Sequence, residues 1–141
     1  MCGLFRRKLR SVNITGRVLV VDDDMGCGRL LALLIRHLGH NAEHVDSGGK
    51  ALEYLANCTP DLVILDVMMP DIDGLEILRR MRENPQTAGV PVVMFSAMAD
   101  PQFRKSAHDR GANDYWVKAS MDFRGLEQRL ASYLPGANAG A

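Results

Sequence analysis

Five short strand-like runs, most of them apolar, are separated by segments with helical periodicity, and they constrain the fold more than any other feature of the sequence. The expected strands are 17–21, 41–45, 61–65, 91–95 and 114–117. The run 61–65 (DLVIL) is the clearest, because it lacks the alternation of a strand with one solvated face. Strands that alternate with helices predict a parallel sheet covered by helices on both faces.

The segments between these runs carry the signals of helices. The first has leucine and isoleucine at helical spacing within 30–38, and Gly39 ends it. Ser47 and Asp100 are placed to cap two later helices. A last helix is expected after Asp122, with one apolar face made of Phe123, Leu126, Leu130 and Leu134. Together these signals predict five strands that alternate with five helices.

The length and composition fit one globular domain. A chain of 141 residues is long enough to bury a core and too short for two domains of ordinary size. We expect a basic, flexible leader at 1–16, the folded domain at 17–134, and a disordered tail of small residues at 135–141. No apolar run approaches the roughly 20 residues of a membrane-spanning helix, so we expect no transmembrane segment.

The formal net charge is zero, but the charges are unevenly distributed. Residues 1–17 hold five of the 17 basic residues and none of the 17 acidic ones, which leaves a net charge of −5 on the rest. An acidic body argues against nucleic acid as a partner, because duplex binding needs several Lys or Arg on one face. The basic leader could contact an anionic membrane or an acidic protein surface, and a solvated arm is the simpler alternative.

The N-terminus and the cysteines indicate a cytoplasmic setting. The basic residues near the N-terminus are followed by no apolar stretch of the kind that a secretory signal contains. The three cysteines, Cys2, Cys27 and Cys58, are odd in number and have no CxxC or CxxH spacing, which argues against a disulfide framework and against a zinc site. A reducing, cytoplasmic compartment fits both observations.

Reactive side chains stand where the expected strands end. Asp22 and Asp23 follow the first strand, Asp66 the third, Ser96 the fourth and Lys118 the fifth. In open parallel sheets, ligands bind outside the carboxyl ends of the strands, where the strand order reverses. The sequence therefore predicts a site that combines three carboxylates, a hydroxyl and an amine.

This set of groups indicates phosphoryl chemistry with a divalent cation. Close carboxylates repel one another, and a cation bound between them removes the repulsion. Carboxylate and carbonyl oxygens are suitable ligands for Mg²⁺ or Mn²⁺. One carboxylate can act as a nucleophile and form an aspartyl phosphate. The hydroxyl of Ser96 and the ammonium of Lys118 can then bind phosphoryl oxygens.

Simpler explanations exist for several of the acidic residues. Asp66 on its own could be a turn or helix-cap carboxylate. Asp24 is better explained as the N-cap of the first helix than as a metal ligand. Asp71 and Asp73 resemble a second acidic motif, but a turn before Gly74 explains them better.

The tryptophan and the histidines are assigned no part in this site. Trp116 is expected to be partly exposed, where it would contact a partner, and filling of the core is the alternative. The histidines have no ligand spacing and are expected on the surface: His37, His40, His44 and His108.

Four stretches, in this order, resemble the receiver domain of two-component response regulators: VLVVDDD, DLVILDVMMPDIDG, VVMFSA and GANDYWVK. The second is the most specific, because an apolar strand precedes Asp66, a Met-Pro pair follows it, and Gly74 stands eight residues after it. The likeness covers about 17–134. It implies a CheY-like α/β domain of the flavodoxin-like type, with five parallel strands in the order 2-1-3-4-5 and helices on both faces.

The resemblance also implies the roles of the acidic residues. Asp66 would be the phosphoryl acceptor. Asp22 and Asp23 would hold Mg²⁺ or Mn²⁺ together with Asp66, and the carbonyl of Met68 would complete the protein ligands. The phosphoryl group would come from a histidine kinase or a histidine phosphotransfer protein.

The resemblance implies a switch as well. Ser96 stands at the position of the family's switch hydroxyl, and Tyr115 at that of its switch aromatic, for which simple sheet packing is the alternative. Phosphorylation would draw Ser96 toward the phosphate, and Tyr115 would swing inward into the space left. One departure concerns Lys118, which the family usually follows with proline but which Ala119 follows here. Because a non-proline cis peptide costs about 2.5–4 kcal/mol, the Lys118 peptide is either trans or strained.

Three functions remain open on these grounds. The first is a single-domain receiver that signals to a downstream protein target, with no output domain after the last helix and with a homodimer left open. The second is a pseudo-receiver that binds partners without phosphorylation, which only Ala119 favours. The third is a phosphatase of the haloacid dehalogenase type, whose Asp-x-Asp motif the residues 22–24 match superficially and which leaves the Asp66 segment unexplained.

Overall fold

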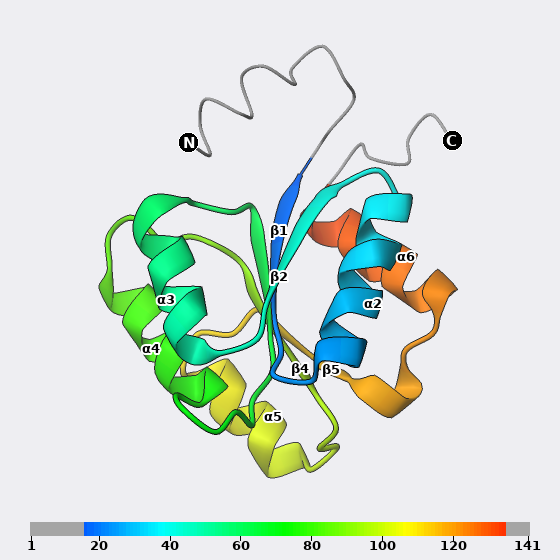
Figure 1. Cartoon of the computed structure of the whole chain (residues 1–141). Helices are drawn as coiled ribbons and strands as arrows, with labels where there is room; N and C mark the ends of the chain where they lie inside the picture. The colour runs from blue at the N-terminus through cyan, green and yellow to red at the C-terminus, as the bar shows by residue number, and fades with distance from the viewer. Residues whose placement is uncertain (1–15, 135–141) are drawn as a thin grey trace.

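The computed structural model describes residues 16–134. The expected leader, apart from Gly16, and the expected tail at 135–141 lie outside the described residues. The elements in chain order, drawn in Figure 1, are β1 (Arg17–Val21), α2 (Met25–His37), β2 (Asn41–Val45), α3 (Gly48–Asn57), β3 (Leu62–Leu65), α4 (Gly74–Glu83), β4 (Val92–Ser96), α5 (Pro101–Asp109), β5 (Asp114–Val117), the 3-10 turn η1 (Lys118–Ser120) and α6 (Phe123–Tyr133).

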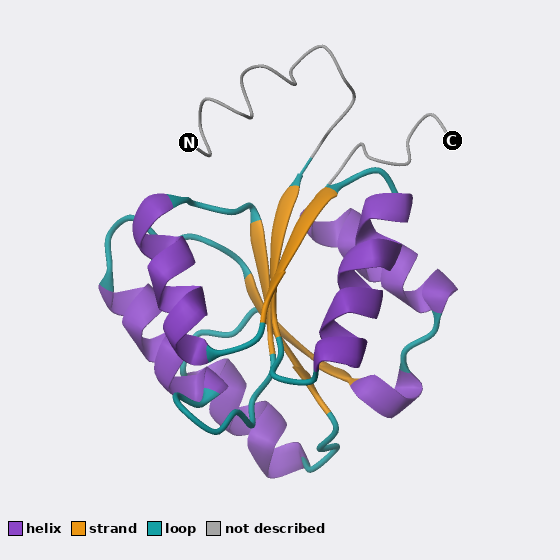
Figure 2. Cartoon of the chain, in the orientation of Figure 1, coloured by secondary structure: helices purple, strands orange, loops and turns teal. Residues whose placement is uncertain are grey.

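The five strands form one parallel sheet in the order β2-β1-β3-β4-β5, which confirms the predicted topology. Figure 2 shows the strands between two groups of helices. Alternate residues of β1 enter different cores: Leu19 and Val21 face α3, α4 and α5, while Val18 and Val20 face α2 and α6. Because helices cover both faces, the ends of the strands are where a ligand site is expected in this sheet.

Helix boundaries follow from side chains that can be recognised in the sequence. Each α-helix begins after a residue whose side chain accepts a backbone N–H of the first turn: Asp24, Ser47, Asp73, Asp100 and Asp122. Gly39 and Gly111 have φ values of 101° and 102°, in the left-handed region that glycine tolerates, and each follows the end of a helix. Asp24 is therefore a cap, as predicted, and Asp73, which was assigned to a turn before Gly74, is the cap of α4.

Several details correct the predictions. Phe123 is 41% exposed, because it opens α6 and lies outside the buried face that Leu126 and Leu130 form. Trp116 is fully buried, because α6 covers its side of β5, so the prediction of partial exposure was wrong. His40 is also buried, contrary to the expected surface position. Between residues 16 and 134, the structure contains no helix with both the length and the apolar character needed to span a bilayer.

Candidate functional site

The predicted residues converge at the carboxyl edge of the sheet. Val21 pairs with Leu65 in the register of β1 and β3, so Asp22 and Asp66 leave the sheet side by side. The backbone N–H of Asp66 donates to the carbonyl of Val21 at 2.9 Å. Ser96 ends β4, and Lys118 follows β5 directly. The topology thus brings together groups that are up to 96 positions apart in the chain.

Three carboxylates form the centre of this arrangement. One oxygen each from Asp22, Asp23 and Asp66 lie within 4.8 Å of one another. Asp22 is 2% exposed and Asp66 is 7% exposed, whereas Asp23 faces solvent. Two nearly buried carboxylates beside a third are costly unless positive charge accompanies them. The all-oxygen donor set fits a hard divalent cation such as Mg²⁺ or Mn²⁺.

Lys118 supplies positive charge to the same site. Its Nζ lies 2.8 Å from Asp22 Oδ2 and 3.6 Å from Asp66 Oδ2. No peptide bond within residues 16–134 is cis, so the bond between Lys118 and Ala119 is trans. The replacement of the usual proline by Ala119 therefore leaves the lysine in contact with both carboxylates.

Burial and neighbouring charges change the ionisation of this group of residues. Burial raises the pKa of Asp66 to about 6; Lys118 opposes the increase, and the negative charge of Asp22 adds to it. Burial alone would lower the pKa of Lys118, but its hydrogen bond to Asp22 and the charge of Asp66 raise that pKa above its usual value. The lysine thus stays charged, while the carboxyl of Asp66, with a pKa of about 6, loses its proton at a higher pH than an ordinary aspartate.

A tight turn after β3 presents Asp66 to the site. The backbone N–H of Met68 donates to Asp66 Oδ1 at 3.3 Å, and that of Gly74 donates to the Val67 carbonyl at 2.8 Å. A Cβ on residue 74 would lie 2.1 Å from the carbonyl oxygen of Asp66. Only glycine permits this close approach of α4 to the strand end, which accounts for the Gly74 of the sequence motif.

Asp71, in the loop between β3 and α4, connects this loop to the start of α3. Its carboxylate accepts the backbone N–H groups of Gly48 and Gly49, at 3.1 and 2.9 Å, at the start of α3. These backbone hydrogen bonds lower the pKa of Asp71. Asp71 and Asp73 therefore bind the first turns of α3 and α4, and neither of them joins the carboxylate cluster.

The side chains of Ser96 and Tyr115 both form hydrogen bonds with the backbone of Met98. Ser96 is buried, and its Oγ accepts the N–H of Met98 at 3.1 Å. The Tyr115 hydroxyl donates to the carbonyl of Met98 at 2.8 Å, and its ring is already buried. The guanidinium of Arg104 lies 5.3 Å from the centre of that ring. The sequence identified Ser96 and Tyr115 but neither their link through the backbone of Met98 nor Arg104, because a backbone link and a ring contact leave no pattern in it.

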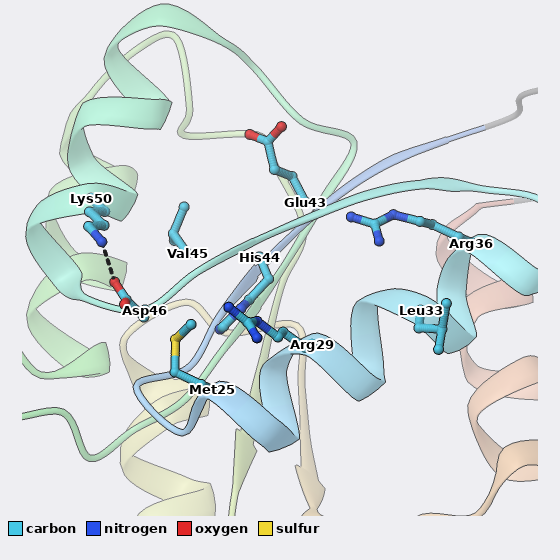
Figure 3. Close-up of a pocket in the computed structure, with 9 residues that line it drawn as sticks. All are labelled: Met25, Arg29, Leu33, Arg36, Glu43, His44, Val45, Asp46 and Lys50. Carbon is cyan, nitrogen blue, oxygen red and sulfur yellow. Dashed lines mark ion pairs between the residues drawn. The ribbon is translucent and has the colours of Figure 1, made fainter.

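His44 is a further neighbour of the site that the sequence assigned to the surface. Its Nε2 lies 2.8 Å from the carbonyl oxygen of Asp22. The ring lines a groove of about 580 Å³ between α2 and β2 (Figure 3). No spacing rule would have found it, because the two residues are 22 positions apart and belong to different elements.

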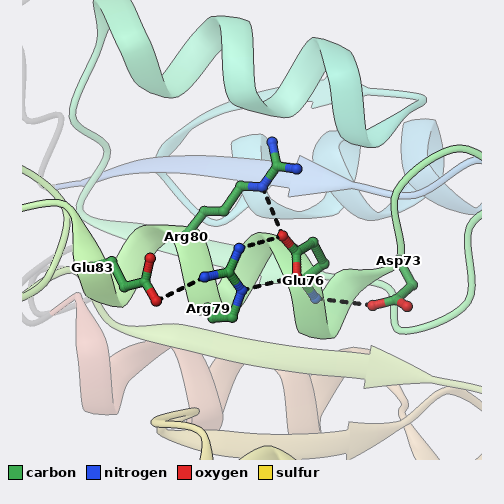
Figure 4. Close-up of polar contacts among 5 residues, drawn as sticks. All are labelled: Asp73, Glu76, Arg79, Arg80 and Glu83. Carbon is green, nitrogen blue, oxygen red and sulfur yellow. Dashed lines mark hydrogen bonds and ion pairs between the residues drawn. The ribbon is translucent and has the colours of Figure 1, made fainter.

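The exposed face of α4 carries charges of a different kind. Arg79 bridges Glu76 and Glu83 at 2.6 and 2.7 Å, and Arg80 also binds Glu76 (Figure 4). These hydrogen bonds and charges lower the pKa of Glu76 to about 2. The pairs follow the three- and four-residue spacing of a helix surface, so they stabilise α4 and do not constitute a site.

Known proteins share both the sequence and the fold of this chain. A model of the family described as "Response regulator receiver domain" matches residues 18–131. The response regulator MprA of Mycobacterium sp. (strain KMS) is 38% identical over 115 residues, which cover 82% of this chain and 47% of MprA. The gliding motility regulatory protein of Myxococcus xanthus is 35% identical over 114 residues, which cover 81% of this chain and 15% of that protein.

Solved structures agree with this assignment. A putative response regulator from Chloroflexus aurantiacus J-10-fl has a TM-score of 0.79 and 32% identity, with 86% of this chain and 98% of that chain covered. The chemotaxis protein CheY4 of Vibrio cholerae has a TM-score of 0.79 and 25% identity, with 85% of this chain and 99% of that chain covered. This chain spans about half or less of the curated relatives it matches. Because the family model covers nearly all of the described residues, the chain belongs to the receiver domain family of two-component response regulators.

Proposed function

We propose that this receiver domain accepts a phosphoryl group on Asp66, with Mg²⁺ or Mn²⁺ held by Asp22, Asp23, Asp66 and the carbonyl of Met68. The observation that carries the proposal is the cluster of three carboxylates within 4.8 Å, with the Lys118 ammonium against two of them. A buried carboxyl beside acidic neighbours and a lysine is suited to accept a phosphoryl group once a cation offsets its charge.

In the proposed reaction, a carboxylate oxygen of Asp66 attacks the phosphorus of a phosphohistidine on a histidine kinase or phosphotransfer protein. The P–O bond forms as the P–N bond breaks, and the histidine keeps the bonding electron pair and takes up a proton. A bound cation would offset the negative charge on the phosphoryl oxygens. Lys118 would bind one phosphoryl oxygen by a charge-assisted hydrogen bond, and Ser96 would bind another.

The proposed signal leaves the site through Met98. If Ser96 turns toward the phosphoryl group, it releases the N–H of Met98, whose carbonyl is bound by Tyr115. Tyr115 is already buried in this conformation, so phosphorylation would act on the Met98 contacts rather than drive the ring inward. The surface formed by α5, β5 and α6 would change accordingly and present itself to a downstream protein, or to a second copy of the chain, in the cytoplasm.

The alternative of a pseudo-receiver has lost its main support. It rested on Ala119, which put the placement of Lys118 in doubt. Lys118 reaches Asp22 and Asp66 with a trans peptide after it, so Ala119 gives no reason to expect loss of phosphoryl binding.

Phosphorylation by a small donor tests the proposal without knowledge of the kinase. Wild-type protein, Asp66→Asn and Asp73→Asn are incubated with acetyl phosphate and Mg²⁺, and their intact masses are measured. Asp73 is a matched control because it is an exposed aspartate that caps α4. We expect a gain of one phosphoryl group for wild type and Asp73→Asn, its loss with a chelator, and none for Asp66→Asn. A wild type that gains no phosphoryl group would favour the pseudo-receiver.

A further inference from the structure

We propose that His44, with Gly28 opposite its ring, is a positioning residue that holds the backbone of Asp22 and Asp23 in the geometry that binds the cation. The proposal deepens the proposed function and rests on it. His44 belongs to β2, the edge strand next to β1, and its side chain crosses to the start of α2.

Residues of β2 hold the backbone of Asp22 from both sides. The N–H of Asp22 donates to the carbonyl of Val45 at 3.1 Å, and the carbonyl of Asp22 lies 2.8 Å from His44 Nε2. A carbonyl oxygen only accepts, so Nε2 carries the hydrogen of this bond. The carbonyl of Asp22 belongs to the peptide group that joins Asp22 to Asp23. His44 therefore fixes the orientation of the peptide from which the Asp23 side chain projects.

The positions of the Asp22 and Asp23 carboxylates depend to different degrees on the orientation of the peptide that joins these two residues. The Asp22 carboxylate accepts the N–H of Asp24 at 3.0 Å and the ammonium of Lys118 at 2.8 Å. The Asp23 carboxylate makes no hydrogen bond or ion pair with any residue in the described range 16–134. Its position within 4.8 Å of the Asp22 and Asp66 carboxylates is therefore set by its backbone. A ligand that is held in place before the cation binds gives a higher affinity for that cation, so a fixed backbone at Asp23 should strengthen binding.

Gly28 provides the space in which the His44 ring lies. A Cβ on residue 28 would be 2.1 Å from Nε2, 2.4 Å from Cδ2 and 2.7 Å from Cε1 of that ring. Glycine is a poor residue for the first turn of a helix, yet it stands here and is buried. A larger residue would force the ring out toward the groove of Figure 3 and away from Asp22. The glycine and the histidine thus form a matched pair between α2 and β2.

Three substitutions separate the hydrogen bond from simple packing. His44→Phe keeps a ring of similar size but removes the N–H. His44→Gln restores a donor, because its amide nitrogen lies the same number of bonds from the backbone as Nε2. His37→Phe is the matched control, since His37 is a histidine of α2 whose ring contacts Phe123, away from the carboxylates.

The affinity for Mg²⁺ is measured by calorimetry on each folded variant, with urea unfolding as the measure of stability. Loss of a single hydrogen bond of about 1.4 kcal/mol corresponds to tenfold in affinity. We expect the Mg²⁺ dissociation constant to rise about tenfold for His44→Phe, about twofold or less for His44→Gln, and not at all for His37→Phe. A merely structural role would lower the urea midpoint of His44→Phe and leave the dissociation constant at the wild-type value, which would overturn the proposal.

Gly28→Ala provides a second, independent test, which also serves if His44→Phe does not fold. In the wild-type background, the added methyl group should displace the ring, lower the melting temperature and weaken Mg²⁺ binding by a similar factor. In the His44→Ala background, the same substitution should raise the melting temperature, because alanine favours a helix more than glycine does. If Gly28→Ala changed the melting temperature in the same direction in both backgrounds, the pairing of Gly28 with His44 would be contradicted.

The outcomes distinguish this proposal from the function on which it rests. If wild-type protein binds Mg²⁺ and is phosphorylated while His44→Phe binds as tightly, only the positioning role is overturned. If wild-type protein binds no Mg²⁺ at millimolar concentration, the proposed function fails, and the role of His44 fails with it.

Discussion

The ammonium of Lys118 lies 2.8 Å from Oδ2 of Asp22 and so joins the end of the last strand to the end of the first. The same ammonium is 3.6 Å from Asp66 Oδ2. In the absence of a cation, Lys118 therefore offsets the charge that would otherwise oppose burial of these carboxylates. A divalent cation held as proposed would share these carboxylates with the lysine, and the resulting competition would have a measurable consequence.

Replacement of Lys118 by methionine should separate cation binding from phosphorylation. Without the competing ammonium, we expect the Mg²⁺ affinity to stay equal or rise. The rate of phosphorylation by acetyl phosphate should fall by about tenfold or more, because a charge-assisted hydrogen bond to the phosphoryl group is lost. Lys105→Met is the control, since Lys105 pairs with Asp109 on the exposed face of α5. Loss of Mg²⁺ binding in Lys118→Met would contradict the proposed competition.

The turn after Asp66 should tolerate no side chain at position 74. Gly74→Ala places a Cβ 2.1 Å from the Asp66 carbonyl, so we expect a loss of about 1–3 kcal/mol in unfolding free energy from overpacking. Phosphorylation should slow as well, because the acceptor itself is displaced. Gly89→Ala is the control, because a Cβ there meets no atom within 4 Å. Urea unfolding and acetyl phosphate kinetics measure both effects, and equal stabilities of the two variants would be evidence against this account of the turn.

Burial of His40 should make the domain less stable in mild acid. Burial lowers the pKa of His40 below its ordinary value of 6.5. The unfolded chain therefore takes up a proton that the folded chain resists, so this stabilising contribution is present above pH 6.5 and is lost as the pH falls below it. Asp66 acts in the opposite direction, because its pKa of about 6 lies above the unfolded value of 3.8 and its contribution is lost as the pH rises through that range.

The comparison of wild type with His40→Gln isolates the histidine, since both proteins retain Asp66. Urea midpoints measured at pH 7.5 and 5.5 should fall more for wild type than for the variant. An equal fall in both proteins would show that His40 is not the group responsible.

Arg82 should stabilise the fold more than its exposed neighbour Arg80. Its guanidinium donates to three backbone carbonyls at 2.8–3.1 Å. Those of Ala88 and Val90 lie in the loop before β4, and that of Gly111 lies just after α5. Arg82→Ala leaves these acceptors without the donor, and we expect a loss of about 2–4 kcal/mol in unfolding free energy. Arg80 makes an exposed ion pair with Glu76 (Figure 4), so Arg80→Ala should cost about 0.2–1 kcal/mol. Similar losses in the two variants would contradict the role of Arg82.

The sequence was informative where a local pattern carries the structure. The strand ends at Asp22 and Asp66, the glycines after α2 and α5, and the capping aspartates all depend on residues that are close together in the chain. Parallel topology then follows from the alternation of strands and helices, and it brings the strand ends to one edge.

What the sequence could not supply depends on contacts between distant elements. Trp116 was expected to be partly exposed, because nothing near it in the chain reveals that α6 covers that side of β5. His44 was assigned to the surface, because its partners, Asp22 after β1 and Gly28 in α2, lie outside its own strand. Gly28 is likewise an unfavourable residue for a helix by its sequence alone, and only the ring opposite it accounts for its place in α2.

One measurement tests phosphorylation of Asp66 most directly. Protein treated with acetyl phosphate and Mg²⁺ is reduced with borohydride, which converts an aspartyl phosphate to homoserine, and its peptides are sequenced by mass spectrometry. We predict homoserine at position 66 alone, only when both Mg²⁺ and acetyl phosphate are present. Homoserine at Asp22 or Asp23, or an unmodified Asp66 in folded protein with Mg²⁺ bound, would contradict the proposal that Asp66 is the phosphoryl acceptor.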